Sequence, residues 1–432
     1  MFLYSYYCGA DRHRALSFLL KMNNLIIDLH ISHEVWLLFG LGMLCLLWAV
    51  FVYGGMARRV ARAVRRDTVD AGIDAETVID TENSVERRPV NCGQPVSVVV
   101  RSFNDGETLA RLLPDLMGQE YSPGFEVIVV NEGSSDETTE VVEALNGTFD
   151  NLYLTFTPND GLNVSSKKLA VTLGVKAARN PIVVLLSADA VIPSPKWLSR
   201  ITLPFVDPSV EVVLGYSTPN LLQDKGFGRR HRAFNLTEES VAWISEALSG
   251  RPYRGSESNL AFRRKVFFDN KGFSSSLNLR EGVDDIFVNE ITNGDNTAVE
   301  LSEQTQIMRD CYDMRAQMRT ARKSHAFTSR FVPRRGSVML NLGSFSVFAA
   351  VVLFAVASVL AWPNVIVAGA SALLALFMII YDVVWWRRAI RALGGPRMML
   401  TLPWLMLTRP VRALIFKVRC RMGHSRNYTY SR

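Results

Sequence analysis

Polar side chains follow two apolar runs of the sequence, at the point where each run ends. Ser102, Asn104 and Asp105 follow the run that starts at Val96, and Glu132 follows the next run. Leucines at helical spacing separate the runs, which predicts a strand, a helix and a second, parallel strand. The polar residues then lie at the carboxyl ends of the strands, where open α/β sheets bind ligands. Carboxylates, amides and hydroxyls there can hydrogen-bond to a polar substrate.

Further strand-like runs position these loops within a larger domain. Such runs recur at 152–156, 182–186 and 210–216, and a helical stretch lies at 167–178. The alternation of strands and helices predicts an α/β fold, with a mostly parallel central sheet flanked by helices on both faces. We expect this domain to cover residues 95–330.

Two apolar regions outside this domain are long enough to cross a membrane. They predict one transmembrane helix within 33–56 and a hairpin of two transmembrane helices within 337–386. Arginines follow the first span, precede the second and follow the third. Because positive residues favour the cytoplasmic side, the pattern predicts a multi-pass protein of the plasma or inner membrane with the 95–330 domain in the cytoplasm. A cleaved signal peptide is the alternative for the first span, but arginines rather than a small-residue cleavage site follow it.

The remaining segments carry weaker signals. Residues 1–32 form an N-terminal extension to which we assign no function, and residues 57–94 are expected to be a cytoplasmic linker. Residues 387–432 are expected to be a basic cytoplasmic tail with an interfacial helix, because arginines and prolines interrupt its apolar stretch. The net charge of +7 comes largely from arginines beside the spans, which suit anionic lipid headgroups, so we predict no nucleic-acid partner. The five cysteines have no spacing typical of a zinc site or a redox dithiol.

These features resemble the membrane-anchored, inverting family 2 glycosyltransferases, which have the A-type, nucleotide-diphospho-sugar transferase fold. The resemblance rests on ordered blocks: Val96-Ser97-Val98-Val99-Val100 with Asn104-Asp105, Asn131-Glu132-Gly133-Ser134, Ser166-Lys167-Lys168, Leu186-Ser187-Ala188-Asp189, Glu281-Gly282-Val283-Asp284-Asp285 and Gln317-Met318-Arg319. The chain departs from the family pattern at Glu132 and Ser187, where the family usually has aspartates, and at Val283, where it has an acidic residue. No tryptophan follows the last block, a partial match to Gln-x-x-Arg-Trp.

The resemblance implies transfer of a sugar, with inversion, from a nucleotide-diphosphate donor to a lipid-linked or glycan acceptor in cell-envelope polysaccharide or glycolipid synthesis. It implies that Asp284 is the general base, with Asp285 as the close alternative. It also implies that Asp189 binds Mg²⁺ or Mn²⁺, which would stabilise the leaving group.

The other motif residues would bind the nucleotide sugar. Either Lys167 or Lys168 would bring positive charge to the diphosphate at the start of a helix, and motif position favours Lys167. The full set of nucleotide-sugar-binding candidates is Ser102, Asn104, Asp105, Glu132, Lys167, Ser187, Asp189, Gln317 and Arg319.

Each block also has a purely structural interpretation. Asp136 and the serines before it could cap the helix expected near Glu137. Asp189 could cap a turn, and the Asp284-Asp285 pair could lie at a helix N-terminus only because the helix dipole favours negative charge there. The order in which the blocks occur favours the catalytic interpretation over these.

Two other functions remain open. The departures at Ser187 and Val283 and the missing tryptophan suggest a catalytically weakened, glycosyltransferase-like scaffold that binds nucleotide sugars at the membrane. A processive polysaccharide synthase with its own translocation channel is a third possibility, although such a channel needs more than three spans.

Overall fold

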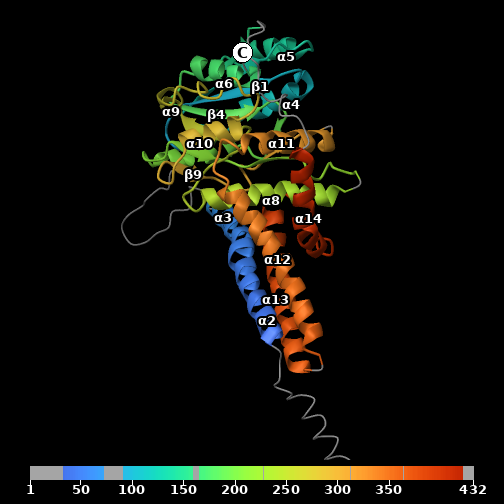
Figure 1. Ribbon diagram of the computed structural model, residues 1–432. Coiled ribbons are helices and arrows are strands. Elements are labelled where there is room, and N and C mark those ends of the chain that lie inside the picture. The colour runs from blue at the N-terminus through green and yellow to red at the C-terminus, as the bar shows by residue number, and fades with distance from the viewer. Residues whose placement is uncertain are drawn as a thin grey trace, which may run out of the picture. The chain divides into compact units, whose positions relative to one another are not determined.

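The computed structural model describes residues 33–72, 91–158, 165–226, 228–311, 313–362 and 364–421, and the chain divides into two compact units (Figure 1). The first unit is Met1–Gly55, Met339–Trp386 and Met399–Leu414, and the second is Met56–Val338, Arg387–Met398 and Ile415–Arg432. The predicted extension 1–32 and part of the predicted linker, 73–90, lie outside the described residues.

Three long apolar helical segments are candidate membrane spans, which confirms the predicted number of apolar helices. They are His33–Ala71, Arg335–Leu360 (α12) and Val365–Ala392 (α13). The first consists of α2 (His33–Trp48), a π-helical turn η1 (Ala49–Tyr53) and most of α3 (Gly54–Gly72). A further helix, α14 (Leu402–Arg421), covers the segment in which an interfacial helix is predicted.

Close packing in the first unit depends on a small residue. A Cβ atom added to Gly343 of α12 would lie 2.8 Å from Cβ of Tyr53, so only glycine fits there without displacement. The ring of Tyr53 also packs against the ring of Trp386, with 4.6 Å between the centroids. Small residues are common where apolar helices approach each other in this way.

Helix α3 continues into the segment predicted as a linker. Apolar residues recur every four positions from Met56 and are buried, and Arg59 Nη1 donates a hydrogen bond to Ser245 Oγ at 2.6 Å. Residues 57–72 are therefore a helix packed within the second unit. The arginines between the apolar positions make the average composition of the segment polar, although its apolar residues have helical spacing.

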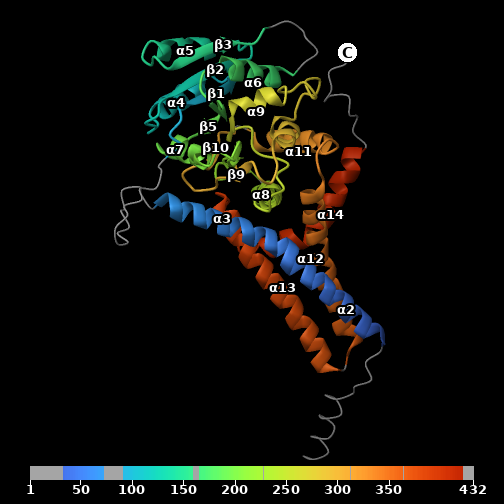
Figure 2. The ribbon, with the colours of Figure 1, turned by 90° about the vertical axis from the view of Figure 1, so that its left-hand side faces the viewer.

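A seven-stranded, mostly parallel sheet forms the centre of the second unit, as predicted (Figure 2). The strand order is β3 (Leu152–Phe156), β2 (Phe125–Asn131), β1 (Val96–Ser102), β4 (Ile182–Ser187), β8 (Leu260–Arg263), β6 (Val212–Leu214) and β9 (Thr297–Val299). Strands β1 to β4 pair in parallel, and β8 is antiparallel to both its neighbours. A smaller sheet has the order β5 (Ala190–Val191), β10 (Ile307–Arg309) and β7 (Ser217–Pro219).

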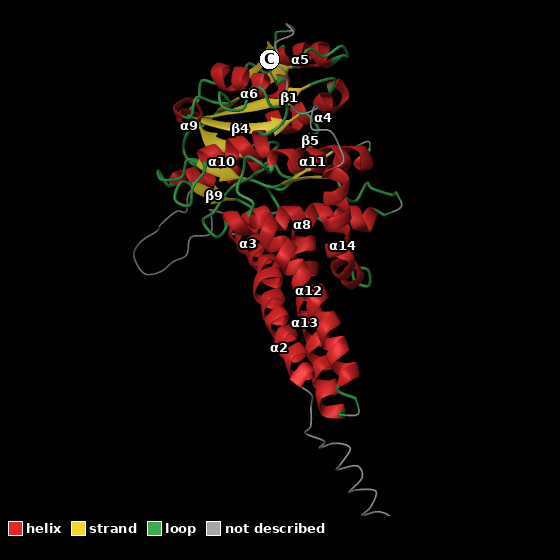
Figure 3. Cartoon of the chain, viewed as in Figure 1, coloured by secondary structure: helices red, strands yellow, loops and turns green. Residues whose placement is uncertain are grey.

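Helices cover the central sheet on both faces (Figure 3). The further helices of this unit are α4 (Gly106–Met117), α5 (Thr138–Asn146), α6 (Ser166–Ala177), α7 (Trp197–Thr202), α8 (Arg229–Ala247), α9 (Arg264–Asp269), α10 (Val288–Ile291) and α11 (Met314–Thr328), with short helical turns η2 (Leu203–Val206) and η3 (Val283–Phe287). Val98 and Val100 pack in one core with the leucines of α4, whereas Val99 faces α6. A Cβ atom on Gly174 of α6 would lie 2.3 Å from Val99, so glycine lets this helix approach β1.

Candidate active site

The predicted polar loops begin side by side at one edge of the large sheet. The register pairs Ser102 of β1 with Asn131 of β2, and Arg101 of β1 with Ser187 of β4. Because the three strands are parallel neighbours, their carboxyl ends meet at this edge. Ser102 itself is buried, and its hydroxyl has no hydrogen-bond partner in the described part of the chain.

Asn104 and Asp105 shape the first of these loops. Asn104 has a positive φ of 55°, its Oδ1 accepts from the Ser135 amide at 2.8 Å, and its amide donates to Ser134 Oγ at 2.9 Å. Asp105 Oδ2 accepts from the Phe103 amide at 2.9 Å. These contacts tie the β1 loop to the β2 loop, and the predicted contacts of both residues with a donor stay a prediction.

Asp136 lies directly before Glu137, the N-cap of α5, and accepts hydrogen bonds from the starts of two helices. Its Oδ2 accepts from the amide of Gly106 at 2.9 Å, and its Oδ1 accepts from the amide of Thr138 at 3.2 Å. One carboxylate therefore serves the first turns of both α4 and α5, which holds the two loops in a fixed relation.

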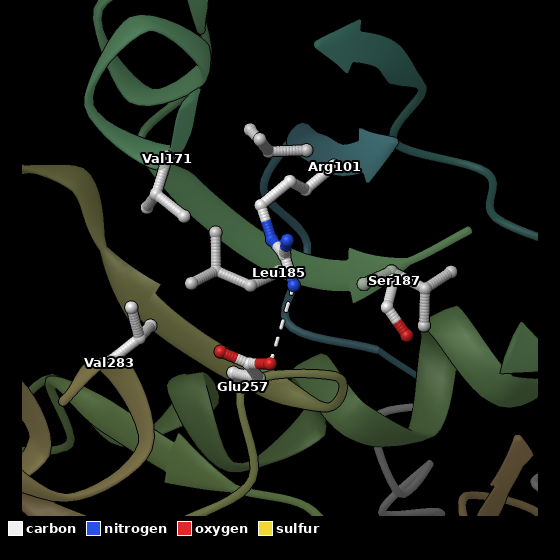
Figure 4. Close-up of a pocket in the computed structure, with 8 residues that line it drawn as sticks. Arg101, Val171, Leu185, Ser187, Glu257 and Val283 are labelled. Atoms are coloured by element: carbon white, nitrogen blue, oxygen red, sulfur yellow. Dashed lines mark hydrogen bonds and ion pairs between the residues drawn. The ribbon is translucent and has the colours of Figure 1, made fainter. Parts of the chain in front are cut away.

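Arg101, at the end of β1, forms ion pairs with two carboxylates. Its Nη1 is 2.8 Å from Glu132 Oε1, and its Nη2 is 3.3 Å from Glu257 Oε1 (Figure 4). The side chain of Glu132 is only 4% exposed, so its carboxylate is enclosed with the guanidinium. Burial lowers the pKa of Arg101, but Glu257 and Glu132 together raise it further, so the guanidinium stays charged.

The space beside this arginine is small. A cavity of about 10 Å³ lies there, roughly the room of one water molecule. Its lining residues are Val99, Arg101, Val171, Leu185, Leu186, Ser187, Glu257 and Val283. The side chains of Arg101 and Glu257 thus occupy much of the space between β1, β4 and the turn η3.

Two adjacent lysines at the start of α6 have different surroundings. Lys167 Nζ is 3.0 Å from Glu281 Oε2, and its pKa is raised, chiefly by the nearby charge of Glu257. Lys168 is fully buried and donates to the carbonyl and the hydroxyl of Ser276, at 2.6 and 3.0 Å. Burial lowers the pKa of Lys168 to about 8. The structure thus places Lys167 beside the charged residues of the site and Lys168 in the interior.

Ser187 and Asp189 lie at the end of β4. The Ser187 hydroxyl donates to Asp189 Oδ1 and accepts from Ser258 Oγ at 2.9 Å. Asp189 Oδ2 is 3.9 Å from Arg309 Nη1, and the Asp189 side chain is 23% exposed. The serine therefore orients the aspartate through a hydrogen bond.

The fit of a divalent cation at Asp189 depends on outside ligands. Among the described residues, no group of three or more His, Cys, Asp or Glu side chains could hold a metal ion. Mg²⁺ and similar cations commonly bind through one or two carboxylates, with substrate phosphates and water as the other ligands. A single accessible carboxylate with a neighbouring hydroxyl fits that mode of binding.

Asp284 and Asp285 lie in η3 and have contrasting environments. Asp284 Oδ2 is 3.0 Å from His325 Nε2 and 3.7 Å from Arg254 Nη2. Burial raises the pKa of Asp284, but His325 and Arg254 lower it more, so this partly exposed carboxylate is ionised. Asp285 is buried, accepts a hydrogen bond from Thr328, and has a pKa raised by burial and by Asp284.

The family model described as "Glycosyltransferase like family 2" matches residues 94–283. This segment is a family 2-like glycosyltransferase domain. The match ends one residue before Asp284 and includes Arg101, Glu132, Lys167 and Asp189.

Curated relatives resemble parts of the chain. Over 97 residues it is 32% identical to a poly-beta-1,6-N-acetyl-D-glucosamine synthase of Staphylococcus epidermidis, which covers 22% of either protein. Over 198 residues it is 25% identical to an uncharacterized protein of Mycobacterium tuberculosis, which covers 44% of this chain and 60% of that protein. The chain thus matches only about a fifth of the length of the synthase.

Solved structures of glycosyltransferases also resemble the chain. A mannosyltransferase from Pyrobaculum calidifontis, in complex with GDP-Man and Mn²⁺, covers 78% of this chain and 97% of its own, with a TM-score of 0.45 and 19% identity. Glucosyl-3-phosphoglycerate synthase from Mycobacterium tuberculosis, with Mn²⁺, UDP and glucosyl-3-phosphoglycerate, covers 56% and 82%, with a TM-score of 0.40 and 17% identity.

Gln317 and Arg319 are exposed on α11, which follows the matched segment of the glycosyltransferase domain. Within the described residues, Gln317 and Arg319 make no hydrogen bond or ion pair with Asp284. His325, further along the same helix, forms a hydrogen bond with Asp284. The binding role predicted for Gln317 and Arg319 stays a prediction.

Sequence motifs do not indicate four charged residues that the candidate site brings together. They are Arg101, Arg254, Glu257 and His325. A charge near the end of a mostly apolar strand was an available signal for Arg101. Arg254 and Glu257 lie in an irregular stretch without periodicity, where spacing offers no signal.

Proposed function

We propose that the protein is a membrane-bound, inverting glycosyltransferase that moves a sugar from a nucleotide-diphosphate donor to a lipid-linked or glycan acceptor. One observation supports this above the others. An ionised, partly exposed Asp284 lies in the same network of nearby charges as Arg101, Lys167 and Glu257, beside the sheet edge of a glycosyltransferase domain. Inverting transfer needs both a base for the acceptor and positive charge for the leaving group.

Asp284 is the proposed general base. As the acceptor hydroxyl oxygen attacks the anomeric carbon, Asp284 takes the hydroxyl proton. The new carbon–oxygen bond forms on the face opposite the donor phosphate, while the bond to the phosphate oxygen breaks and its electron pair leaves with the nucleoside diphosphate. The hydrogen bond from His325 orients the carboxylate.

Positive charge for the leaving group comes from Arg101 and Lys167. The amide groups at the start of α6 add favourable dipoles, because a helix N-terminus attracts anions. Asp189, oriented by Ser187, would hold Mg²⁺ or Mn²⁺, which when bound supplies further positive charge to the diphosphate.

The acceptor and the location are proposed from other features. One relative is named for the synthesis of an N-acetylglucosamine polymer, which supports a glycan or glycan-lipid acceptor. The three candidate spans support an integral membrane protein, and the arginines that flank them support a cytoplasmic catalytic domain.

A nucleotide-release assay tests this function. We expect the purified protein, with Mg²⁺ or Mn²⁺ and a panel of UDP, GDP and dTDP sugars, to release nucleoside diphosphate when a lipid-linked or glycan acceptor is present. Asp189→Ala and Asp284→Asn should abolish release. Asp207→Asn is the matched control, because Asp207 contacts Ser209 in an exposed loop. Full activity in both site variants would contradict the assignment.

The packed charges at the sheet edge favour a second candidate, a weakened glycosyltransferase that serves as a nucleotide-sugar-binding scaffold. Arg101 already pairs with Glu132 and Glu257, and the cavity beside them holds about one water molecule. For the scaffold, calorimetry would show nucleotide-sugar binding, while no donor and acceptor pair would turn over.

A further inference from the structure

Glu257 lies on the loop between α8 and β8, and its carboxylate is surrounded by positive charge. Its Oε1 is 3.3 Å from Arg101 Nη2. Burial and, less strongly, the charge of Asp284 raise the pKa of Glu257, but Lys167 and Arg101, with a smaller effect from Arg309, lower it more. Cations from three separate parts of the fold therefore stabilise one ionised carboxylate.

These cations coincide with those proposed to hold the donor diphosphate. Glu257 also has the largest effect in raising the pKa of Lys167, although the short ion pair of Lys167 is with Glu281. Two anions in one low-dielectric site repel each other strongly. A diphosphate that approaches Arg101 and Lys167 must therefore displace the carboxylate of Glu257.

We propose that Glu257 competes with a donor phosphate for Arg101 and Lys167. This inference rests on the proposed function and identifies a residue that sets donor affinity. The position of Glu257 on an irregular loop, outside any strand or helix, allows it to withdraw without breaking the sheet.

The same loop also contacts the proposed base, so donor binding and base positioning are coupled. Arg254 Nη2 is 3.7 Å from Asp284 Oδ2 and 2.6 Å from His325 Nε2, and the Gly255 amide donates to the Asp284 carbonyl at 2.7 Å. Only two residues separate Arg254 from Glu257. Movement of this loop together with Glu257 would shift the backbone that carries Arg254, so we assign Arg254 as a positioning residue for Asp284.

The surroundings of Glu257 distinguish this role from metal binding. Its nearest described partner is a guanidinium, and the described residues contain no cluster of acidic and histidine ligands that includes it. If Glu257 were a metal ligand, removal of its charge would weaken nucleotide binding. If Glu257 is a competing anion, removal of its charge strengthens nucleotide binding.

Calorimetry on the full-length protein tests whether loss of the Glu257 charge strengthens or weakens binding. The probes are inorganic pyrophosphate, UDP and GDP, each with and without Mn²⁺. We expect Glu257→Gln to bind them about tenfold more tightly, equivalent to about 1.4 kcal/mol. Glu257→Asp, with a shorter and still charged side chain, should fall between. The control is Glu211→Gln, because Glu211 accepts a hydrogen bond from Asn296 and forms no ion pair with an arginine or lysine among the described residues.

The outcomes separate this inference from the proposed function. If the wild type binds nucleotide and Glu257→Gln binds equally or more weakly, the competition is refuted and the proposed function stands. If neither protein binds any probe, both fail. For coupling, Arg254→Lys should lower kcat and move the acidic limb of the kcat–pH profile to higher pH, because a less well placed cation stabilises ionised Asp284 less. An unmoved limb would refute the positioning role.

Discussion

The donor side and the base side of the site are built from different kinds of structure. On the donor side, Arg101 and Lys167 come from the end of a parallel strand and the start of a helix. On the base side, Asp284 lies in a π-helical turn and is held by a loop arginine and by His325 of α11. The donor cations are already paired with carboxylates, whereas the base is a carboxylate kept ionised by its partners. With the proposed roles, donor binding would break ion pairs, whereas Asp284 is already ionised.

The largest expected effect separates the two aspartates on the base side. Asp284→Asn should lower kcat roughly 10²- to 10⁴-fold, because the amide cannot take the acceptor proton. Asp285→Asn should change kcat much less and act mainly on stability, because Asp285 is buried against Thr328. Steady-state kinetics with thermal unfolding of both variants checks this. The reverse order would move the base to Asp285.

On the donor side, Arg101→Leu should destabilise the protein by roughly 3 kcal/mol, because it leaves the enclosed Glu132 carboxylate without its ion pair. Thermal unfolding in detergent measures the loss. Combining the change with Glu132→Leu should restore much of the stability, since both charges are then absent. If the stability losses of the two single variants simply add in the double variant, the Arg101–Glu132 ion pair is not the cause of the destabilisation.

The strands and loops of the donor side could be predicted from the sequence, although Arg101 could not, because regular apolar runs precede these loops. The runs before Ser102, Glu132 and Asp189 are apolar and β-branched, so their strands and the shared edge follow from local pattern. What could not be predicted was the partner of Glu132. Pairing of Arg101 with a residue one strand away depends on register, which the spacing of each run does not reveal.

The base side was less predictable because tertiary contacts build it. The acidic pair was visible at Asp284 and Asp285, but nothing in the spacing indicates that Arg254 and His325 converge on Asp284 from a loop and a distant helix. Strand β8 was also missed, since its four residues follow an irregular stretch, and the run at 210–216 forms the shorter β6. Short elements of this kind are stabilised by their neighbours more than by their own sequence.

The pH dependence of stability should distinguish the two lysines that begin α6. The pKa of Lys168 in the folded protein is about 8, below its ordinary value of 10.5, so the unfolded chain binds more protons between these values and stability rises with pH there. The expected gain is roughly 3 kcal/mol from pH 8 to 10.5. Thermal unfolding across this range should show that Lys168→Met loses the rise.

Lys167→Met is the matched control and should keep the rise. The pKa of Lys167 is raised above its ordinary value of 10.5 in the folded protein. Its contribution to the free energy of unfolding is therefore fully present below pH 10.5 and is lost only as the pH rises through the pKa of the folded protein. If the Lys167 variant instead showed no increase in stability with pH, Lys167 would be the interior lysine and Lys168 the one that faces the site.

The smallest expected effect concerns the far part of the base side. Gln317→Ala and Arg319→Ala should change kcat/KM within about twofold, because both side chains are exposed and surface substitutions cost little. His325→Ala, on the same helix, should lower kcat and move its acidic limb to higher pH, since ionised Asp284 loses a partner that lowers its pKa. If the alanine variants of Gln317 and Arg319 instead lost activity as strongly as His325→Ala, the partial motif would be functional. Helix α11 would then contact the substrate through the face that is exposed here, and the base side would extend beyond the contacts of Asp284.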